Sequence, residues 1–200
     1  IDIPAGRVTL GKTRDDARYG WDNEYGQREV VLEAFQAAQL LTSNREFLAF
    51  VNAGGYTDAR WWSEEGWRWR RVAAAKHPTF WVRTNDDWQL RLMCEQAGMP
   101  WDWPVEVNYH EAEAFCRWQA EQSGTPIRLP SEDEWYRLYD LAQIDPPAPG
   151  AAMSANLHLD HFASPCPVYR FAQGDFYDLS GNVWQWTQTP IYPFEGFAVH

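Results

Sequence analysis

The chain contains three helix starts of the same chemical kind, and they constrain its fold more than any other part of the sequence. Ser43 with Glu46, and Ser131 with Glu134, have the spacing of a capping box, in which each side chain accepts from the backbone N–H of the other residue. Asn108 precedes a third such segment and can cap it. Apolar residues recur at helical spacing after each start. We therefore predict helices within residues 43–54, 108–124 and 131–142.

Between these helices the sequence is rich in glycine, proline, asparagine and tryptophan, and poor in the alternation of a surface strand. Thirteen tryptophans contribute to an aromatic content of 16%, and a buried indole needs a partner for its N–H. The best strand candidates are 6–11 and 28–35, followed by 167–171 and 181–186. We predict an α+β domain with two to three helices, short antiparallel strands and long ordered loops. The proline-rich stretch 145–152 is expected to be one of these loops.

The size and charge of the chain narrow its class of partner. Two hundred residues suit one domain with a sizeable core. The formal net charge of −11 makes the average surface repel a nucleic-acid backbone or an anionic membrane, so we expect neither as a partner. No apolar run approaches the roughly 20 residues that cross a bilayer, and the first residues do not resemble a secretory leader. Three widely spaced cysteines indicate neither a disulfide framework nor a zinc site, which favours the cytoplasm.

Four ordered segments of the chain resemble a known family. The stretches NREFLAFVNAGGY, VNYHEAEAFCRW, IRLPSEDEW and DLSGNVWQWT are similar, in order and spacing, to the signature segments of the formylglycine-generating-enzyme (sulfatase-modifying factor) family. The resemblance covers nearly the whole chain and implies a C-type-lectin-like α+β fold. Because that fold carries both enzymes and non-catalytic modules, it does not fix the chemistry.

A finer resemblance points to one branch of that family. The segments YGWDNEYG, WWSEEGWRWR, MPWDWPVEVNYHEAEAFC, ASPCPV and GNVWQWTQTPIYPFEGFAVH resemble the lectin-like domain of ovothiol-pathway sulfoxide synthases, whose near relatives are ergothioneine-pathway enzymes. The resemblance implies that non-haem Fe(II) and O2 couple a cysteine thiol to the imidazole carbon of histidine, giving 5-histidylcysteine sulfoxide. It favours free cysteine over a γ-glutamyl derivative as the sulfur donor. The alternatives are an ergothioneine-type synthase and a module retained for binding or scaffolding.

The same resemblance implies parts that these residues do not contain. In the family, three histidines of an N-terminal helical domain hold the iron, and a methyltransferase domain, which would use S-adenosylmethionine, usually follows the lectin-like one. We therefore expect residues 1–200 to form a formylglycine-generating-enzyme-like domain, incomplete at its C-terminal end. Its expected partners are an iron-binding helical domain of the same polypeptide and the small molecules cysteine and histidine.

The histidines of the chain offer little for an iron site of its own. Non-haem iron prefers imidazoles and a carboxylate on one face, with positions left open for substrate and O2. Only the segment HLDH brings two histidines, His158 and His161, close to a carboxylate, Asp160. As a strand, this segment would send the two histidines to opposite faces. We predict no metal ligands in this chain, whose histidines are His77, His110, His158, His161 and His200.

The cysteines are also poor candidates for catalysis, although formylglycine-generating enzymes work through cysteines. Cys116 falls on the apolar face of a predicted helix and Cys94 follows two apolar residues, so both are expected to be buried. Cys166 lies between two prolines and is expected to be more exposed, but it has no basic neighbour nearer than Arg170 to lower its pKa. We predict no catalytic thiol, which counts against formylglycine-generating activity.

The segment DLSGNVWQWTQTP and the loop after it hold the main site candidates. In an extended segment, Trp184 and Trp186 face the same side, and we expect Trp184 in the core and Trp186 at the boundary between core and site. The resemblance places the loop after Trp186 near the reaction centre and implies an acid tyrosine in this domain, for which Tyr192 is the candidate and a position just beyond His200 is the other option. Phe194 and Phe197 of that loop would line the substrate pocket. The alternative is that Tyr192 packs under the residues that follow it.

Two further segments have both a structural and a functional interpretation. Trp21, Asn23 and Glu24 form a polar and aromatic cluster that either lines the substrate pocket or makes a structural turn. The segment WWSEEGWRWRR interleaves tryptophan with arginine, a pattern that supports cation–π contacts of about 0.5 to 1 kcal/mol each. We expect it to pack against its own domain, with docking of the helical domain as the alternative.

Overall fold

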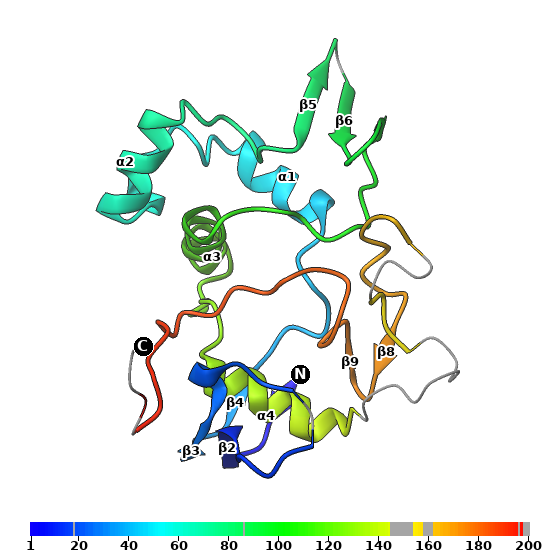
Figure 1. Cartoon of the computed structure of the whole chain (residues 1–200). Coiled ribbons are helices and arrows are strands. Elements are labelled where there is room, and N and C mark those ends of the chain that lie inside the picture. The colour runs from blue at the N-terminus through cyan, green and yellow to red at the C-terminus, as the bar shows by residue number, and fades with distance from the viewer. Residues whose placement is uncertain (18, 86, 145–153, 158–161, 196, 198–200) are drawn as a thin grey trace. The chain divides into compact units, whose positions relative to one another are not determined.

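The computed structural model describes the chain apart from residues 18, 86, 145–153, 158–161, 196 and 198–200. The chain forms two compact units, each discontinuous in sequence. The first unit comprises Ile1–Gln39, Pro130–Asp145 and Thr187–His200, and the second comprises Leu40–Leu129 and Pro146–Trp186. Both units contain helices and strands (Figure 1).

The first unit is built on an antiparallel pair of strands. Strand β2 (Gly6–Lys12) pairs along its whole length with β3 (Gly26–Leu32). Side chains alternate across such a pair: Val8 and Leu10 are buried, whereas Thr9 between them is exposed. A second short pair joins β1 (Asp2–Ile3) to β4 (Phe35–Gln36).

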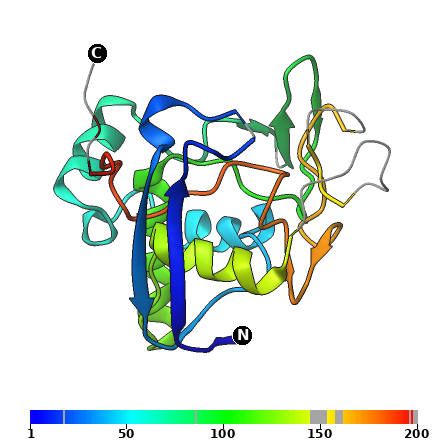
Figure 2. The same ribbon diagram turned by 60° about the horizontal axis from the view of Figure 1, so that its bottom comes forward.

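Helix α4 (Glu132–Ala142) packs against β2 and β3 and crosses them, as Figure 2 shows. It begins with the expected capping box. The Glu134 N–H donates to Ser131 Oγ at 3.1 Å, and the Ser131 N–H donates to Glu134 Oε2 at 2.7 Å. Arg28 Nη2 on β3 donates to Asp133 Oδ1 at 2.7 Å. The first turn of α4 is therefore tied both to its own cap and to the neighbouring strand.

The second unit has an aromatic core. Phe47 stacks on Phe115 with ring centroids 5.2 Å apart and meets Phe50 edge to face at 5.4 Å. The buried Trp62 donates its indole N–H to the Gly55 carbonyl at 2.8 Å, so its polar atom is satisfied inside the core. The helices around this core are α1 (Asn44–Asn52), η2 (Ala59–Trp61), α2 (Glu64–Val72) and α3 (Tyr109–Ser123) (Figure 1).

The strands of the second unit are short. An antiparallel sheet contains β5 (Trp81–Thr84), β6 (Asp87–Arg91) and β7 (Gln96–Gly98), in that order. A tight hairpin joins β8 (Ala172–Gln173) to β9 (Phe176–Tyr177). Across the described parts of both units, no helix is long and apolar enough to cross a membrane.

The sequence-based predictions of regular structure are confirmed in part. The three expected helices are α1, α3 and α4, and the two best strand candidates are β2 and the β3–β4 segment. The strands expected at 167–171 and 181–186 were wrong, because both segments consist of turns, bends and irregular backbone. The β5–β7 sheet was not predicted, and neither bounds nor a cap were predicted for helix α2. The loop expected at 145–152 lies outside the described residues.

Candidate functional site

A buried polar network lies at the base of the segment 183–190. Asp178 is fully buried, and Asn182 Nδ2 donates to Asp178 Oδ2 and to the Cys166 carbonyl, each at 3.0 Å. Asn182 Oδ1 accepts from the Cys166 N–H at 2.9 Å. Gln185 Nε2 donates to the Asp178 carbonyl at 2.7 Å. Side chains therefore hold the backbone of this turn, as asparagine and aspartate often do.

Asp178 has an unusual environment for a carboxyl group. Burial raises the pKa of Asp178 to about 6, against the opposite effect of the Asn182 hydrogen bond. Its Oδ1 atom has no hydrogen-bond partner among the described residues. Asp178 and Asn182 both adopt left-handed backbone, with φ of 52° and 63°. Aspartate and asparagine tolerate this conformation better than most residues, so the network stabilises a turn that few other side chains would allow.

Trp184 and Trp186 lie on the outer side of the segment that leaves this network. Exposed and half-buried residues alternate from Val183 to Pro190, in agreement with the prediction that the two indoles face the same way. Trp184 is fully exposed, however, so the prediction of a core position was wrong. The inner side belongs to the intervening residues, because Gln185 must point inward to reach the Asp178 carbonyl.

Trp186 is half exposed, yet contacts fix its orientation. Its Nε1–H donates to the Val107 carbonyl at 2.9 Å. Its ring meets Tyr109, the first residue of α3, edge to face with centroids 6.0 Å apart. The part of the indole that remains accessible is therefore a rigid aromatic surface. Such a surface suits stacking on a flat ring or contact with a cation.

In the first unit, Phe194 lies against the end of the β2–β3 pair at which β2 finishes and β3 begins. A Cβ atom on Gly26 would lie 2.3 Å from Phe194 Cβ, and one on Gly11 would lie 2.7 Å from Phe194 Cζ. Gly11 and Gly26 have φ of 90° and 130°, which side chains of L-residues rarely allow. The two glycines therefore leave a recess that the Phe194 side chain occupies.

The residues before Phe194 are attached to the start of helix α4. The Gln188 N–H donates to the Pro130 carbonyl at 2.9 Å. The Glu132 N–H at the beginning of the helix donates to Thr189 Oγ1, also at 2.9 Å. This part of the chain therefore has a second attachment within the first unit, in addition to the Phe194 contact.

Between these two attachments the chain is open to solvent. Ile191 and Tyr192 are 93% and 73% exposed. The exposure of Tyr192 argues against the alternative that it packs under the residues after it. Phe197 is half-buried, and its N–H donates to the Phe194 carbonyl at 3.1 Å. Whether these side chains line a substrate pocket stays a prediction.

Trp21, Asn23 and Glu24 lie in the loop that joins β2 to β3. Residues Asp22–Glu24 form a short 3-10 helix, η1, and the three predicted side chains are exposed. Trp21 meets Tyr19 edge to face with centroids 5.5 Å apart. Because Phe194 contacts Gly26 at the start of β3, the structure brings this loop and the 187–197 segment to the same end of the strand pair. Trp186 alone among the predicted site residues belongs to the second unit.

The cysteines differ from their predicted environments in two of three cases. Cys166 is completely buried, and Cys94 is exposed, so both of these predictions were wrong. Cys166 is buried because the Asn182 side chain holds its backbone inside the polar network. Cys116 is half-buried, and burial raises its pKa to about 11 with a smaller contribution from Glu113.

The described side chains do not fit a resident iron ion. Among them, no group of three or more His, Cys, Asp or Glu residues is placed to hold a metal. His77 Nδ1 lies 3.0 Å from the Pro78 carbonyl, and His110 packs beside Trp69 with ring centroids 6.2 Å apart. The HLDH segment and His200 lie outside the described residues, so the prediction made for them is not tested.

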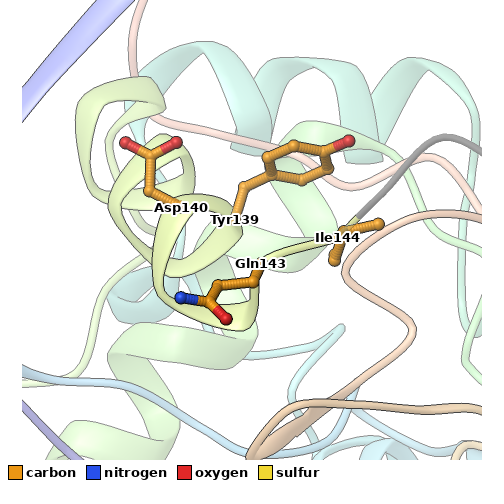
Figure 3. A pocket seen from close by; sticks show the side chains of 4 residues that line it. All are labelled: Tyr139, Asp140, Gln143 and Ile144. Carbon is orange, nitrogen blue, oxygen red and sulfur yellow. The ribbon is translucent and has the colours of Figure 1, made fainter.

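An open recess lies at the C-terminal end of α4. It has a volume of about 410 Å³, and its lining residues are Tyr139, Asp140, Gln143 and Ile144 (Figure 3). The four side chains point in different directions instead of toward a common point. A ligand site usually combines an apolar wall with converging polar groups. This recess has no such arrangement, and it does not serve as the candidate site.

Comparisons with known proteins confirm the resemblance to the formylglycine-generating-enzyme (sulfatase-modifying factor) family. Residues 1–196 match the family model described as Sulfatase-modifying factor enzyme 1-like domain. A protein named hercynine oxygenase from Mycolicibacterium thermoresistibile is 34% identical, over 94% of this chain and 43% of that relative. A formylglycine-generating enzyme from Mycobacterium tuberculosis is 26% identical, over 96% of this chain and 74% of that relative. The chain thus spans less than half the length of the hercynine oxygenase.

A solved structure supports the fold. PvdO from Pseudomonas aeruginosa superposes with a TM-score of 0.62 at 20% sequence identity, over 92% of this chain and 69% of that chain. At this level of identity the likeness concerns the fold alone. The predicted α+β class, with helices and short antiparallel strands, is confirmed.

Proposed function

The chain belongs to the Sulfatase-modifying factor enzyme 1-like domain family, and from that premise we propose that it is part of a non-haem Fe(II), O2-dependent sulfoxide synthase. The enzyme would join the sulfur of cysteine to the imidazole carbon of histidine, as in ovothiol biosynthesis. This chain would supply part of the substrate pocket, and a helical domain of the same polypeptide would hold the iron. S-adenosylmethionine would take part only if that polypeptide also carries a methyltransferase domain.

The similarity to a hercynine oxygenase supports the coarser part of this proposal, an O2-dependent enzyme that acts on an imidazole substrate, and the choice of histidine rests on the resemblance of the sequence segments. The identity to that relative is 34%, against 26% for the formylglycine-generating enzyme, although each alignment covers nearly the whole chain. A branch of the family that acts on an imidazole substrate with O2 is therefore favoured over the branch that modifies protein cysteines.

The environments of two cysteines also argue against the branch that modifies protein cysteines. A thiol must be accessible and deprotonated to act as a nucleophile or a metal ligand. Burial raises the pKa of both Cys116 and Cys166, and Cys166 is closed off from solvent. The exposed Cys94 remains, but a single surface thiol does not make a formylglycine-generating site.

The proposed reaction balances without an added reductant. The thiol and the imidazole carbon each lose a hydrogen, and a carbon–sulfur bond forms. One oxygen atom of O2 is transferred to sulfur, and the other leaves as water. An enzyme for this reaction must hold the thiol beside the imidazole, and such positioning contributes up to roughly 7 to 11 kcal/mol in favourable cases. Fixed and accessible aromatic side chains, such as Trp186, are suited to orient a flat imidazole ring.

The name of the hercynine oxygenase relative favours a second candidate, an ergothioneine-type synthase. Hercynine is the betaine of histidine with three methyl groups on the amino nitrogen. Histidine and hercynine therefore differ only in the methylation of that nitrogen. Quaternary ammonium groups bind to the faces of tryptophan and tyrosine rings. The half-exposed Trp186, with Tyr109 at its edge, offers an aromatic surface of this kind.

A parallel assay separates the two candidates. The full-length protein, loaded with Fe(II), is given cysteine and O2 with either histidine or hercynine, and the products are identified by mass spectrometry. We expect a sulfoxide adduct with histidine. A marked preference for hercynine would favour the ergothioneine-type enzyme. Cysteine sulfinate as the sole product, with iron bound, would contradict both.

Two alternative substrates test for formylglycine-generating activity and identify the sulfur donor. A peptide with a sulfatase-type cysteine serves as an alternative substrate, and formylglycine in that peptide would contradict the proposal. γ-Glutamylcysteine in place of cysteine identifies the sulfur donor. No turnover with any acceptor, in protein whose iron content has been measured, would favour a binding or scaffold module.

A further inference from the structure

The side chain of Tyr192 is largely open to solvent. Its side chain is 73% exposed, and among the described residues it has neither a hydrogen bond nor a ring contact. A tyrosine that delivers a proton must hold its hydroxyl near one position. Within this chain, the attachments on either side of Tyr192 set the position of its backbone, from which the side chain projects.

That backbone has one attachment before Tyr192 and one after it. The earlier attachment joins Gln188 and Thr189 to the start of α4 through two hydrogen bonds. The later attachment is Phe194, only two residues beyond Tyr192. Its side chain lies so close to Gly11 and Gly26 that a Cβ atom added to either glycine would overlap with it.

We propose that Phe194 is a positioning residue for Tyr192, and that the recess formed by Gly11 and Gly26 seats it. The inference rests on the proposed function, in which Tyr192 is the acid. It changes the role of Phe194, which the sequence suggested as a wall of the substrate pocket. Phe194 acts through the backbone, by restraining the segment from which the Tyr192 side chain projects.

Gly11 and Gly26 differ in what a substitution at each of them would disturb. A Cβ on Gly11 would lie 2.1 Å from the Gly26 carbonyl oxygen, so Gly11 is required by the backbone of the strand pair itself. A Cβ on Gly26 would meet the Phe194 side chain first, at 2.3 Å. A substitution at Gly26 would therefore block the recess, and it would also strain the backbone there, where φ is 130°.

Hydrogen exchange in the full-length protein tests the attachment directly. We compare Phe194→Ala, Phe194→Leu and Gly26→Ala with the wild type. Emptying or blocking the recess should speed exchange within residues 187–197 by about tenfold, equivalent to about 1.4 kcal/mol of local stability. Phe194→Leu, which refills part of the recess, should restore most of the protection. Because Gly26→Ala also strains the start of β3, exchange in β2 and β3 reports that strain, and the two Phe194 variants decide the proposal.

Phe80→Ala is the matched control variant. Phe80 is a partly exposed phenylalanine of the second unit, with Arg91 stacked over its ring at 5.6 Å. Its removal should leave exchange within residues 187–197 at the wild-type rate. Unchanged exchange in Phe194→Ala would overturn the proposal, whatever the activity of the protein.

A double-mutant cycle tests whether Phe194 acts through Tyr192. The measured quantity is the ratio of sulfoxide adduct to cysteine sulfinate, which an acid near the bound oxygen would control. Tyr192→Phe and Phe194→Ala should each lower this ratio severalfold, and the double variant should be no worse than Tyr192→Phe alone. Independent, multiplying effects would overturn the positioning role. A wild-type protein without sulfoxide product would refute the proposed function, and the exchange result would still decide whether Phe194 fixes the segment.

Discussion

The Tyr56 hydroxyl donates to Glu111 Oε1 at 2.5 Å inside the aromatic core of the second unit. The other carboxyl oxygen, Glu111 Oε2, accepts from the Asn108 N–H at 2.9 Å and closes the capping box of α3. Burial raises the pKa of both Glu111 and Tyr56. One buried carboxyl group therefore serves the start of a helix and the core at the same time.

Glu111→Gln should destabilise the protein although it preserves the size of the side chain. The amide has one acceptor oxygen and one donor nitrogen, so either the Asn108 N–H or the Tyr56 hydroxyl loses its acceptor. We expect the free energy of unfolding to fall by about 1 to 3 kcal/mol, measured by urea denaturation with tryptophan fluorescence. The control is Glu113→Gln, which removes the surface ion pair with Arg117 and should cost no more than about 0.5 kcal/mol. Equal losses in the two variants would contradict the shared role of Glu111.

Ionisation of Asp178 should lower the free energy of unfolding as the pH rises. Its pKa is raised from 3.8 to about 6 in the folded chain, so the folded state binds this proton more tightly than the unfolded state. The contribution to the free energy of unfolding is therefore lost between about pH 4 and pH 6, and it amounts to at most about 3 kcal/mol. Asp178→Asn cannot ionise and should remove this component. Denaturation at pH 4 and pH 7 measures the difference, and identical pH dependence in wild type and variant would refute it.

The helices could be predicted because their signals are local. The capping boxes at Ser43, Asn108 and Ser131 are formed as expected, each within four residues of sequence. Helix α2 also begins with a serine cap, in which Ser63 Oγ accepts from the Gly66 N–H at 3.1 Å. Gly66 stands where a capping box has glutamate or glutamine, so the signal was incomplete. The acidic first turn and basic last turn of α2 were the remaining clue.

The candidate site was harder to predict because distant residues decide it. Alternation indicated that Trp184 and Trp186 share a side, but not which side faces inward. The bond from Gln185 to the Asp178 carbonyl decides this, and that turn is held by the bonds between Asn182 and Cys166 across a separation of 16 residues. The seat of Phe194 is formed by two glycines near the other end of the chain. Neither contact leaves a local pattern, so the flanking prolines suggested exposure for Cys166 where the fold buries it.

The reactivity of the cysteines should follow their exposure and not their neighbours in sequence. Cys94 is exposed, Cys116 is half-buried and Cys166 is buried. Because the thiolate is the reactive form and burial raises the pKa of Cys116 and Cys166, brief treatment of the native protein with iodoacetamide should modify Cys94 first. Peptide mass spectrometry identifies the modified residue, and denatured protein, in which all three should react, is the control. Early labelling of Cys166 would show that the polar network opens readily in solution.

Trp184 and Trp62 should respond very differently to removal of the indole. Trp184 is fully exposed, whereas Trp62 is 5% exposed and hydrogen-bonded to Gly55. Trp184→Ala should change the free energy of unfolding by no more than about 0.5 kcal/mol, and Trp62→Ala should lower it by about 3 to 5 kcal/mol. Trp184→Ala should also remove the part of the native fluorescence that iodide quenches most easily. A loss above about 2 kcal/mol in Trp184→Ala would mean that this indole packs in solution, and that Gln185 does not occupy the inner side of the segment.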